Sequence, residues 1–344
     1  FEMVGFEPTG EEQARILRSR KKRKLVVGGI QAGKALGIET PIPTPGGWTV
    51  MGAVEEGDYV YGDNGEAVRV KWVSPIQELE SYRIEFDNGT SIIASGEHQW
   101  MVRNWNARKH GLATVKIRTT EEMIAEGLIR FGPRPRRNPF ANWSITNPRP
   151  LVCSKVDLPL DPYVLGVWLG DGNSNVAAMT TADNEVLVQL AWAGVDVRPT
   201  RNPMHYGMGG MAHPDGRHTQ ESHDASLDKV LRRLGVLNNK HIPQEYLRAS
   251  IEQRLALLQG LMDTDGYVDK RGRIEFYSTK KPLIDGFIEL VISLGCSFRL
   301  REKRAMLYGK DCGPVWTVAF QTRMPVFRLG RKARRLRPDL HSSR

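Results

Sequence analysis

Hydrophobic and polar residues follow three different patterns along the chain. Residues 11–20 have the spacing of a helix, with Thr9 as its N-cap, and the apolar residues 25–27 follow as a strand. From 35 to about 105 the pattern becomes short alternating runs, such as 68–73 and 82–86, separated by Asp-Asn-Gly turns. Because Asn-Gly between two alternating runs is typical of a hairpin, this second region is predicted to be all-β.

The remaining chain divides into an irregular segment and a repeated α/β region. Residues 106–157 are basic and proline-rich, with one helix expected near 120–126, and indicate a linker or a DNA-contacting arm. Residues 158–330 contain two apolar helices, 163–172 and 257–266, that each end in Asp-Gly and are each followed by strand-like and helical segments. This duplication predicts two related halves.

Length and composition limit the class of protein. A chain of 344 residues with 40% hydrophobic and 26% charged residues is typical of a soluble protein with two or three domains. No apolar run reaches the roughly 18 residues of a membrane span, and the N-terminus has no pattern of a signal peptide. Because no such span is present, we expect no membrane partner. Cys153, Cys296 and Cys312 lack CxxC spacing, so we expect a reducing cytoplasm, no disulfide framework and no zinc module.

The net charge of +10 favours a polyanionic partner. Basic residues form three blocks, at 18–24, 130–149 and 331–337. Any one block is explained by a solvated surface or a tail. Three basic blocks, together with the positive net charge of the whole chain, favour contact with nucleic acid. Within the second block, the candidate DNA-binding residues are Arg134, Arg136, Arg137 and Arg149.

A phosphate-binding loop is interrupted near the N-terminus. Residues 28–34, from Gly28 through Gly33 to Lys34, follow the pattern of a P-loop after a strand. The pattern requires a Ser or Thr next, as a magnesium ligand, but Ala35 follows, and three prolines and two glycines within 40–47 exclude the helix that holds phosphate. The ATPase pattern therefore stops at Lys34, and a different element begins at Ala35.

The duplicated helices predict a pair of carboxylates. Small residues lie four positions apart in each helix, Gly166 and Gly170 in one and Gly260 and Thr264 in the other, and therefore share a face. Pairing of these faces would bring together Asp171 and Asp265, which lie 94 residues apart, at adjoining helix ends.

Two adjoining carboxylates at helix C-termini repel each other unless a cation lies between them. Carboxylates together with the backbone carbonyls of Gly170 and Thr264 suit Mg²⁺, which can promote hydrolysis of a phosphodiester. A simpler interpretation is that Asp-Gly only ends each helix. Two copies with matching faces favour the metal site.

These two segments resemble the paired motifs of LAGLIDADG homing endonucleases, over roughly 158–330. The resemblance implies a monomer with pseudo-two-fold αββαββα repeats, a double-stranded DNA partner on two β-sheets, and Mg²⁺-dependent cleavage with Asp171 and Asp265 as metal-binding catalytic acids. Residues 239–243 resemble the family's Lys-x-Ile-Pro block, so Lys240 is either an electrostatic support for the cleaved phosphate or an exposed lysine. Lys280 and Lys281 either approach that phosphate or form a helix N-terminal surface.

Residues 35–102 resemble the N-terminal half of an intein, the all-β Hint fold of protein splicing, through blocks at 36–44, 57–60 and 89–98. The resemblance implies that His98 polarises the peptide bond at the Lys34–Ala35 junction, that Ser95 keeps the hydroxyl of the usual Thr, and that splicing needs no cofactor. Alone, His98 would more often be a structural histidine, but the surrounding block and the interrupted P-loop reverse that interpretation. Splicing must restore a Ser or Thr after Lys34, so nucleotide binding by Gly28, Gly33 and Lys34 is expected only after splicing.

Two departures from the intein pattern leave alternatives open. Ala35 offers no nucleophile, so either a natural Cys was replaced or the chain belongs to an intein class that starts without one. Trp100 favours the second alternative, unless it is a core residue. No C-terminal splicing block is recognisable before Arg344, so we expect a truncated reading frame, or half of a split intein whose partner is a C-terminal fragment.

Residues 1–34 resemble the start of a phage terminase large subunit, which implies the cytoplasm of a phage-infected or bacterial cell. The expected domains are then the host segment, the Hint part, the basic arm, the endonuclease and a basic tail, at 1–34, 35–105, 106–157, 158–330 and 331–344. Two further interpretations stay open: a splicing element whose endonuclease has decayed to a DNA-binding domain, and a P-loop ATPase motor.

Overall fold

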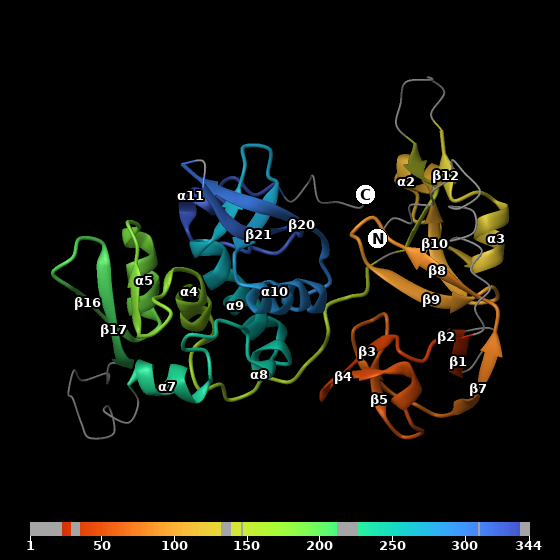
Figure 1. The fold of residues 1–344 in the computed structure, drawn as a ribbon, viewed down its shortest axis with the longest axis horizontal. Helices are drawn as coiled ribbons and strands as arrows, with labels where there is room; N and C mark the ends of the chain where they lie inside the picture. The colour runs from red at the N-terminus through yellow and green to blue at the C-terminus, as the bar shows by residue number, and fades with distance from the viewer. Residues whose placement is uncertain are drawn as a thin grey trace. The chain divides into compact units, whose positions relative to one another are not determined.

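The computed structural model describes residues 23–28, 35–131, 139–145, 147–211, 226–308 and 310–337. These residues form two compact units that divide between Arg149 and Pro150 (Figure 1). Several predicted features lie outside the described residues: the helix over 11–20, the loop residues Gly33 and Lys34, and the DNA-binding candidates Arg134, Arg136 and Arg137.

The first unit is built on a five-stranded antiparallel sheet of order β7-β1-β2-β9-β8. Its strands are β1 (Arg23–Gly28), β2 (Ala35–Gly37), β7 (Val73–Leu79), β8 (Ser81–Glu85) and β9 (Ser91–Ser95). The predicted Asn-Gly hairpin joins β8 to β9: Gly89 has φ +87°, and the Asn88 side chain accepts a hydrogen bond from the Thr90 amide at 2.9 Å. The expected all-β character of residues 35–105 agrees with this sheet.

Short hairpins and single turns complete this β-region. Strands β3 (Pro41–Thr44) and β4 (Gly47–Val50) pair with each other, as do β5 (Tyr59–Tyr61) and β6 (Ala67–Arg69). A single 3₁₀ turn, Met51–Ala53, follows β4. Pro41–Thr44 is thus a strand of an isolated hairpin, where the missing donors of its prolines cost no sheet hydrogen bonds.

Residues 106–149 are part of the first unit, which differs from the expected linker. Strand β10 (Gln99–Asn104) pairs with β11 (Lys116–Thr119) on one side and β14 (Trp143–Ile145) on the other. Helix α3 (Thr120–Ala125) begins where predicted, at a capping box formed by Thr119 and Glu122. Met123 and Trp143 are almost fully buried with Ala94 and Val102, so this segment completes a hydrophobic core. Elements α2 (Trp105–Lys109), β12 (Ile129–Arg130) and β13 (Phe140–Ala141) lie in the same segment.

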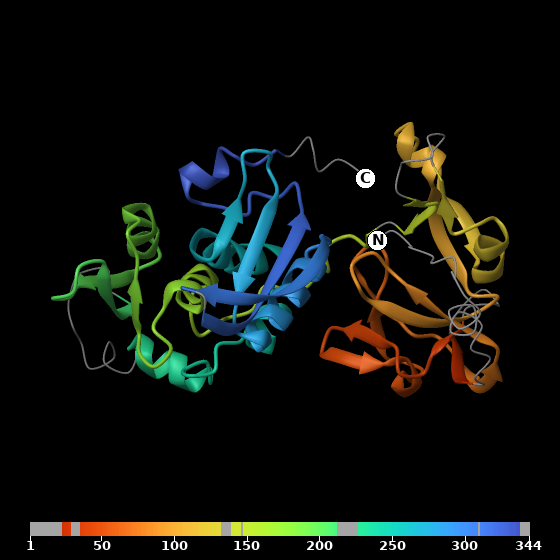
Figure 2. The same ribbon diagram turned by 45° about the horizontal axis from the view of Figure 1, so that its top comes forward.

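The second unit contains two successive sets of helices and strands (Figure 2). The first set is α4 (Pro162–Asp171), β15 (Ala178–Thr180), α5 (Asn184–Trp192), β16 (Val195–Pro199), β17 (His205–Met211) and α7 (Leu227–Arg233). After α8 (Gln244–Leu247), the second set is α9 (Ile251–Thr264), β18 (Gly266–Val268), β19 (Ile274–Ser278), α10 (Lys281–Ser293), β20 (Ser297–Leu307), β21 (Lys310–Gln321) and α11 (Gly330–Ala333).

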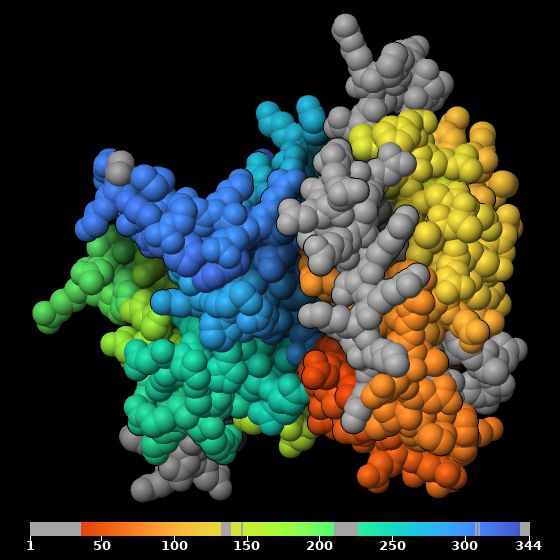
Figure 3. Space-filling view, turned by 45° about the vertical axis from the view of Figure 1, so that its right-hand side comes forward, coloured from red at the N-terminus to blue at the C-terminus, as the bar shows by residue number. Residues whose placement is uncertain are grey.

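Each set forms its own antiparallel sheet, of order β15-β17-β16 and β18-β19-β21-β20. Helix α10 packs on the second sheet, where Phe287 stacks on Phe276 with ring centroids 4.1 Å apart. The two Asp-Gly helices, α4 and α9, pack against each other at the centre of the unit. On the face in Figure 3, residues of the last strands (blue) lie directly beside residues of the helices that precede them (teal). Within the described ranges, none of the helices combines the length and the apolar character that a membrane crossing needs.

Candidate functional site

Helices α4 and α9 approach closely because glycines face each other between them. A Cβ atom built on Gly166 would lie 2.4 Å from the Leu257 carbonyl oxygen, and one built on Gly260 would lie 2.3 Å from the Tyr163 carbonyl oxygen. One turn later, a Cβ on Gly170 would lie 2.0 Å from the Thr264 hydroxyl. The predicted small-residue faces therefore form this contact.

Asp171 and Asp265 lie at the adjoining C-terminal ends of these helices. Burial raises the pKa of Asp171 to about 6, the negative charge of Asp265 adds to this rise, and Lys332 and Lys240 oppose it. Burial likewise raises the pKa of Asp265, against the two lysines. The tertiary structure thus brings together two acids from distant positions of the chain in a partly desolvated place.

Lys240 is anchored beside Asp171 and is not the exposed lysine of the simpler interpretation. Its Nζ donates hydrogen bonds to the carbonyl oxygens of Gly170 at 2.9 Å and Gly172 at 2.7 Å. The loop 237–243, which follows α7, positions it. Burial lowers the pKa of Lys240 to about 8, although both aspartates favour its charged form.

A second lysine of the site, Lys332, is buried, although its position in a basic block predicted a basic tail over 331–344. This residue lies in α11, and its Nζ donates to the carbonyl oxygens of four residues at the end of α9: Met262, Asp263, Thr264 and Gly266, at 2.9, 2.8, 3.2 and 2.7 Å. Burial lowers its pKa to about 8. Its spacing of 92 residues from Lys240, close to the 94 that separate the aspartates, was the available signal in the sequence.

A third aspartate, Asp263, is fully buried and is a structural residue of α9. It accepts hydrogen bonds from the backbone amides of Arg328 at 3.1 Å and Leu329 at 3.2 Å and from the Tyr163 hydroxyl at 3.0 Å. These bonds hold the segment before α11 and so fix the position of Lys332.

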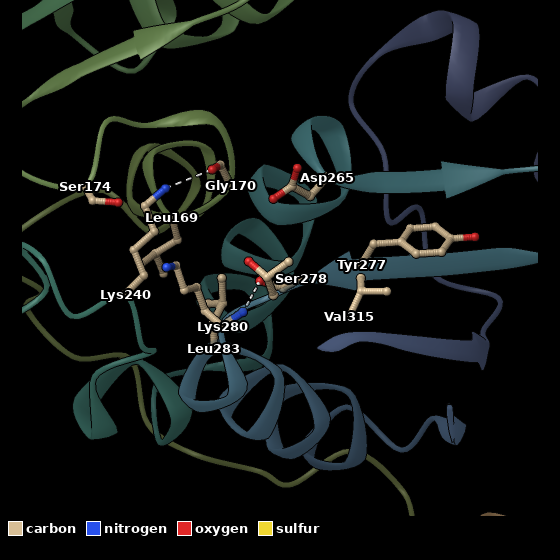
Figure 4. A pocket seen from close by; sticks show the side chains of 11 residues that line it. Leu169, Gly170, Ser174, Lys240, Asp265, Tyr277, Ser278, Lys280, Leu283 and Val315 are labelled. Atoms are coloured by element: carbon tan, nitrogen blue, oxygen red, sulfur yellow. Dashed lines mark hydrogen bonds between the residues drawn. The ribbon is translucent and has the colours of Figure 1, made fainter. Parts of the chain in front are cut away.

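A cavity of about 320 Å³ opens beside Asp265. Its walls include Asp265, Lys240, Lys280, Ser278 and Tyr277, and Figure 4 shows Asp265 and the two lysines around this space. Lys280 therefore lies at the site, while Lys281, the next residue, is exposed and forms an ion pair with Asp285 within α10.

The protein supplies only some of the oxygen ligands that a hard cation such as Mg²⁺ would need between the two acids. In the part of the chain that the structure describes, no three His, Cys, Asp or Glu residues gather as a metal site. The predicted carbonyl ligands each accept a lysine hydrogen bond, Gly170 from Lys240 at 2.9 Å and Thr264 from Lys332 at 3.2 Å. Two oxygen-bearing side chains with water or phosphate oxygens would still suit Mg²⁺, which usually keeps several non-protein ligands.

The first unit groups the predicted splicing residues near strand β2. The registers pair Leu36 with Ala94, so the strand that contains Ala35 lies beside the strand that ends at Ser95. His98 lies in the turn after Ser95 and donates its backbone amide to the Ser95 carbonyl oxygen at 3.2 Å. Lys34, the other side of the junction, lies outside the described residues.

Trp100 is buried next to His98, with ring centroids 4.5 Å apart in an edge-to-face contact. Its indole N–H donates to the Thr120 hydroxyl at 2.9 Å. Trp100 is thus part of the hydrophobic core, which the sequence analysis held as the alternative, and it also packs on His98.

Two further predicted residues, Arg149 and Gly28, also lie in the first unit. Arg149 is exposed at the end of the first unit, and its backbone amide donates to the Asp63 carbonyl oxygen at 2.9 Å. Gly28 is the last residue of β1.

Comparison with known proteins bears on both units. Residues 252–323 match the family model described as a LAGLIDADG-like domain. The chain is 35% identical over 317 residues to the replicative DNA helicase DnaB of Mycobacterium intracellulare, a match that covers 88% of this chain and 49% of that protein. It is 26% identical over 246 residues to the homothallic switching endonuclease of Saccharomyces cerevisiae, covering 61% and 41%. The chain thus spans about half the length of the curated relatives that it matches, or less.

Solved structures give two further likenesses. The splicing domain of the Msm DnaB1 intein is 37% identical, with 26% of this chain and 63% of that chain covered and a TM-score of 0.22. Variants of the homing endonuclease I-DmoI are 13% identical, with 48% and 89% covered and a TM-score of 0.32. The relatives are helicases and an endonuclease, so the terminase expected for residues 1–34 has no support from them. These likenesses agree with an intein that contains a LAGLIDADG homing endonuclease domain, and residues 252–323 match the model of the LAGLIDADG-like family.

Proposed function

We propose that the second unit cuts both strands of double-stranded DNA, acting as a monomer. The observation that carries this proposal is the meeting of Asp171 and Asp265 at the ends of α4 and α9, with a hydrogen-bonded lysine beside each helix end. A site with two acids and two cations, on the unit that matches the LAGLIDADG-like family, suits hydrolysis of phosphodiesters.

The two halves of this unit support the pseudo-two-fold arrangement that we propose. Gly172 forms a β-bridge with Met179 after α4, and Gly266 pairs with Phe276 after α9. Lys240 and Lys332 then bind the carbonyl oxygens at the ends of α4 and α9 respectively. Repetition of one arrangement suits a substrate with two antiparallel strands.

In the hydrolysis, the oxygen of a water molecule forms a new bond to phosphorus, one P–O ester bond breaks, and the leaving oxygen takes up a proton. Mg²⁺, when bound by Asp171 and Asp265, would supply Lewis-acid stabilisation of the phosphate charge. The chain itself keeps both carboxylates in place through helix packing and excludes part of the solvent. Lys240 and Lys332, in their charged forms, stabilise the negative charge that develops on the phosphate.

Asp265→Asn tests this proposal. We expect the variant to lose DNA cleavage while it keeps its fold, measured by circular dichroism, and its DNA binding, measured in EDTA on DNA selected from a random pool. Asp157→Asn changes an exposed aspartate of the same unit and should keep cleavage. Cleavage by the Asp265→Asn protein at the wild-type rate would refute the assignment, and absence of cleavage by the wild-type protein would favour a domain that only binds DNA.

We propose further that the first unit supports acyl transfer at the Lys34–Ala35 junction, together with a C-terminal intein part. Support comes from Ser95 and His98, which lie beside the strand that begins at Ala35. A peptide carbonyl is a poor electrophile, so a donor near the junction is what the reaction requires. Addition of the C-terminal part of a related intein should give cleavage or ligation at Lys34 with wild type and none with His98→Ala. Equal products from both would exclude this role.

A further inference from the structure

The turns that lead into helices α5 and α10 have the same local structure. The amide of Lys280 donates to the Ser278 hydroxyl at 3.1 Å, and α10 begins at the next residue. The amide of Asp183 donates to the Thr181 hydroxyl at 3.1 Å, and α5 begins at the next residue. Lys280 and Asp183 therefore hold equivalent positions in the two halves of the second unit.

The two equivalent residues have opposite charges. Lys280 is exposed and lines the cavity that also contains Asp265 and Lys240. Figure 4 shows its backbone held by Ser278 at the edge of that cavity. Its positive charge also lowers the pKa of Lys240, which places the two cations near each other. The α10 side of the site thus offers two lysines, Lys240 and Lys280, to a phosphate.

On the side of the site that contains Asp183, the described cations Arg331 and Lys332 both bind protein groups. Asp183 accepts hydrogen bonds from the Arg331 guanidinium at 2.8 and 2.7 Å, so an ion pair occupies the position that corresponds to Lys280. Glu185, two residues later, accepts from the Gly330 amide at 2.8 Å and adds a second carboxylate. Lys332 remains as the anchored lysine on this side.

We propose that Lys280 makes the α10 side of the site the stronger phosphate site, so that one DNA strand is held more tightly and is cut before the other. This inference rests on the proposed endonuclease function. A phosphate near Lys280 and Lys240 gains attraction from two cations, whereas a phosphate near Arg331 competes with Asp183 for the guanidinium. The first cut leaves a nicked duplex, and the second strand is hydrolysed by the same reaction.

A binding experiment without metal tests the unequal phosphate sites apart from cleavage. A duplex selected from a random pool is prepared with single uncharged methylphosphonates through its central positions, on either strand, and binding is measured in EDTA. We expect one position on one strand to weaken binding of wild type about tenfold, and the strongest position on the other strand to weaken it about threefold or less. With Lys280→Ala, the larger effect should fall to about threefold.

A cleavage experiment tests the order of the cuts. With each strand labelled separately and Mg²⁺ present, wild type should nick one strand at least about fivefold faster than the other. Lys280→Ala should slow that strand selectively and bring the two rates within about twofold. Asp183→Asn, which keeps an N-cap for α5 but releases Arg331, should speed the slower strand.

The matched control is Lys270→Ala, which removes one exposed lysine from the turn after β18 and should keep the strand preference. Equal effects of methylphosphonates on both strands, equal nicking rates, or a preference that Lys280→Ala leaves unchanged would each overturn the inference. If binding in EDTA shows a strand difference that depends on Lys280, but no metal supports cleavage, the unequal phosphate sites are supported. The proposed endonuclease function is then refuted.

Discussion

Gly166 and Gly260 face each other across the contact between α4 and α9, where the Cβ that either residue lacks would lie within 3.0 Å of the other's Cα. This contact sets how closely the two helix ends, and therefore Asp171 and Asp265, approach. A packing feature far from solvent thus determines the geometry of the candidate site.

The first prediction concerns this contact. Gly166→Ala should lower the free energy of unfolding of the second unit by roughly 3 kcal/mol or more, because the new methyl group meets backbone atoms, which relax less readily than side chains. Urea unfolding followed by circular dichroism measures the change. Gly207→Ala is the matched control, since its Cβ would lie 3.9 Å from the nearest backbone oxygen. Equal stability of the two variants would contradict the close packing.

The second prediction compares the two lysines that bind the helix-end carbonyls, Lys240 and Lys332. Lys332→Met should lower the free energy of unfolding by about 2–4 kcal/mol and Lys240→Met by about 1–2 kcal/mol, because unsatisfied carbonyls at helix ends are costly. Lys332 serves four carbonyl oxygens and Lys240 two. Thermal and urea unfolding in EDTA give both values. A larger loss for Lys240→Met would show that the number of carbonyls served does not decide the cost.

The third prediction is a pH-dependent gain of stability in Asp171→Asn. The pKa of Asp171 in the folded protein is about 6, mainly because of burial, whereas an unfolded chain has about 3.9. The folded state therefore holds the proton more tightly, and the stability of wild type falls as the pH rises from about 4 to about 6.

Asparagine has no charge to desolvate, so the free energy of unfolding of the variant should exceed that of wild type by about 1–3 kcal/mol at pH 7 and by little at pH 4. This range allows for the partial exposure of the carboxylate. Urea unfolding in EDTA at both values of pH measures the difference. Asp157→Asn, at an exposed position, should show no such change between the two. A gain for Asp171→Asn that is the same at pH 4 and pH 7 would exclude ionisation of this acid as the cause.

The fourth prediction concerns the core of the first unit. Trp100→Phe should destabilise that unit by about 1–3 kcal/mol, because it removes a donor from the buried Thr120 hydroxyl along with part of the packing. In a double-mutant cycle with Thr120→Val, the two losses should not add. Thr120→Ser keeps the hydroxyl and serves as the control. Strict additivity would mean that the hydrogen bond contributes nothing measurable.

Local sequence patterns predicted the secondary structure where local physics decides it. The Asn88-Gly89 turn forms the hairpin between β8 and β9 because only a few residue types adopt its positive φ. Spacing of small residues predicted the face by which α4 and α9 meet, because residues four apart lie on one side of a helix. The proline-rich segment after β10 was harder, since its basic charge conceals the buried Met123 and Trp143 that make it part of a core.

The sequence by itself determined that two Asp-Gly helices exist and that their small-residue faces match, since both follow from residues close together in the chain. Only the tertiary structure decided that Lys332 belongs to the site: its partners are backbone carbonyls about 66 to 70 residues away, and these bonds form only because α11 packs on the end of α9. The opposite charges at Lys280 and Asp183 likewise acquire meaning only when two equivalent turns are placed in one fold. Long-range hydrogen bonds and burial, which depend on how the helices pack, account for this difference.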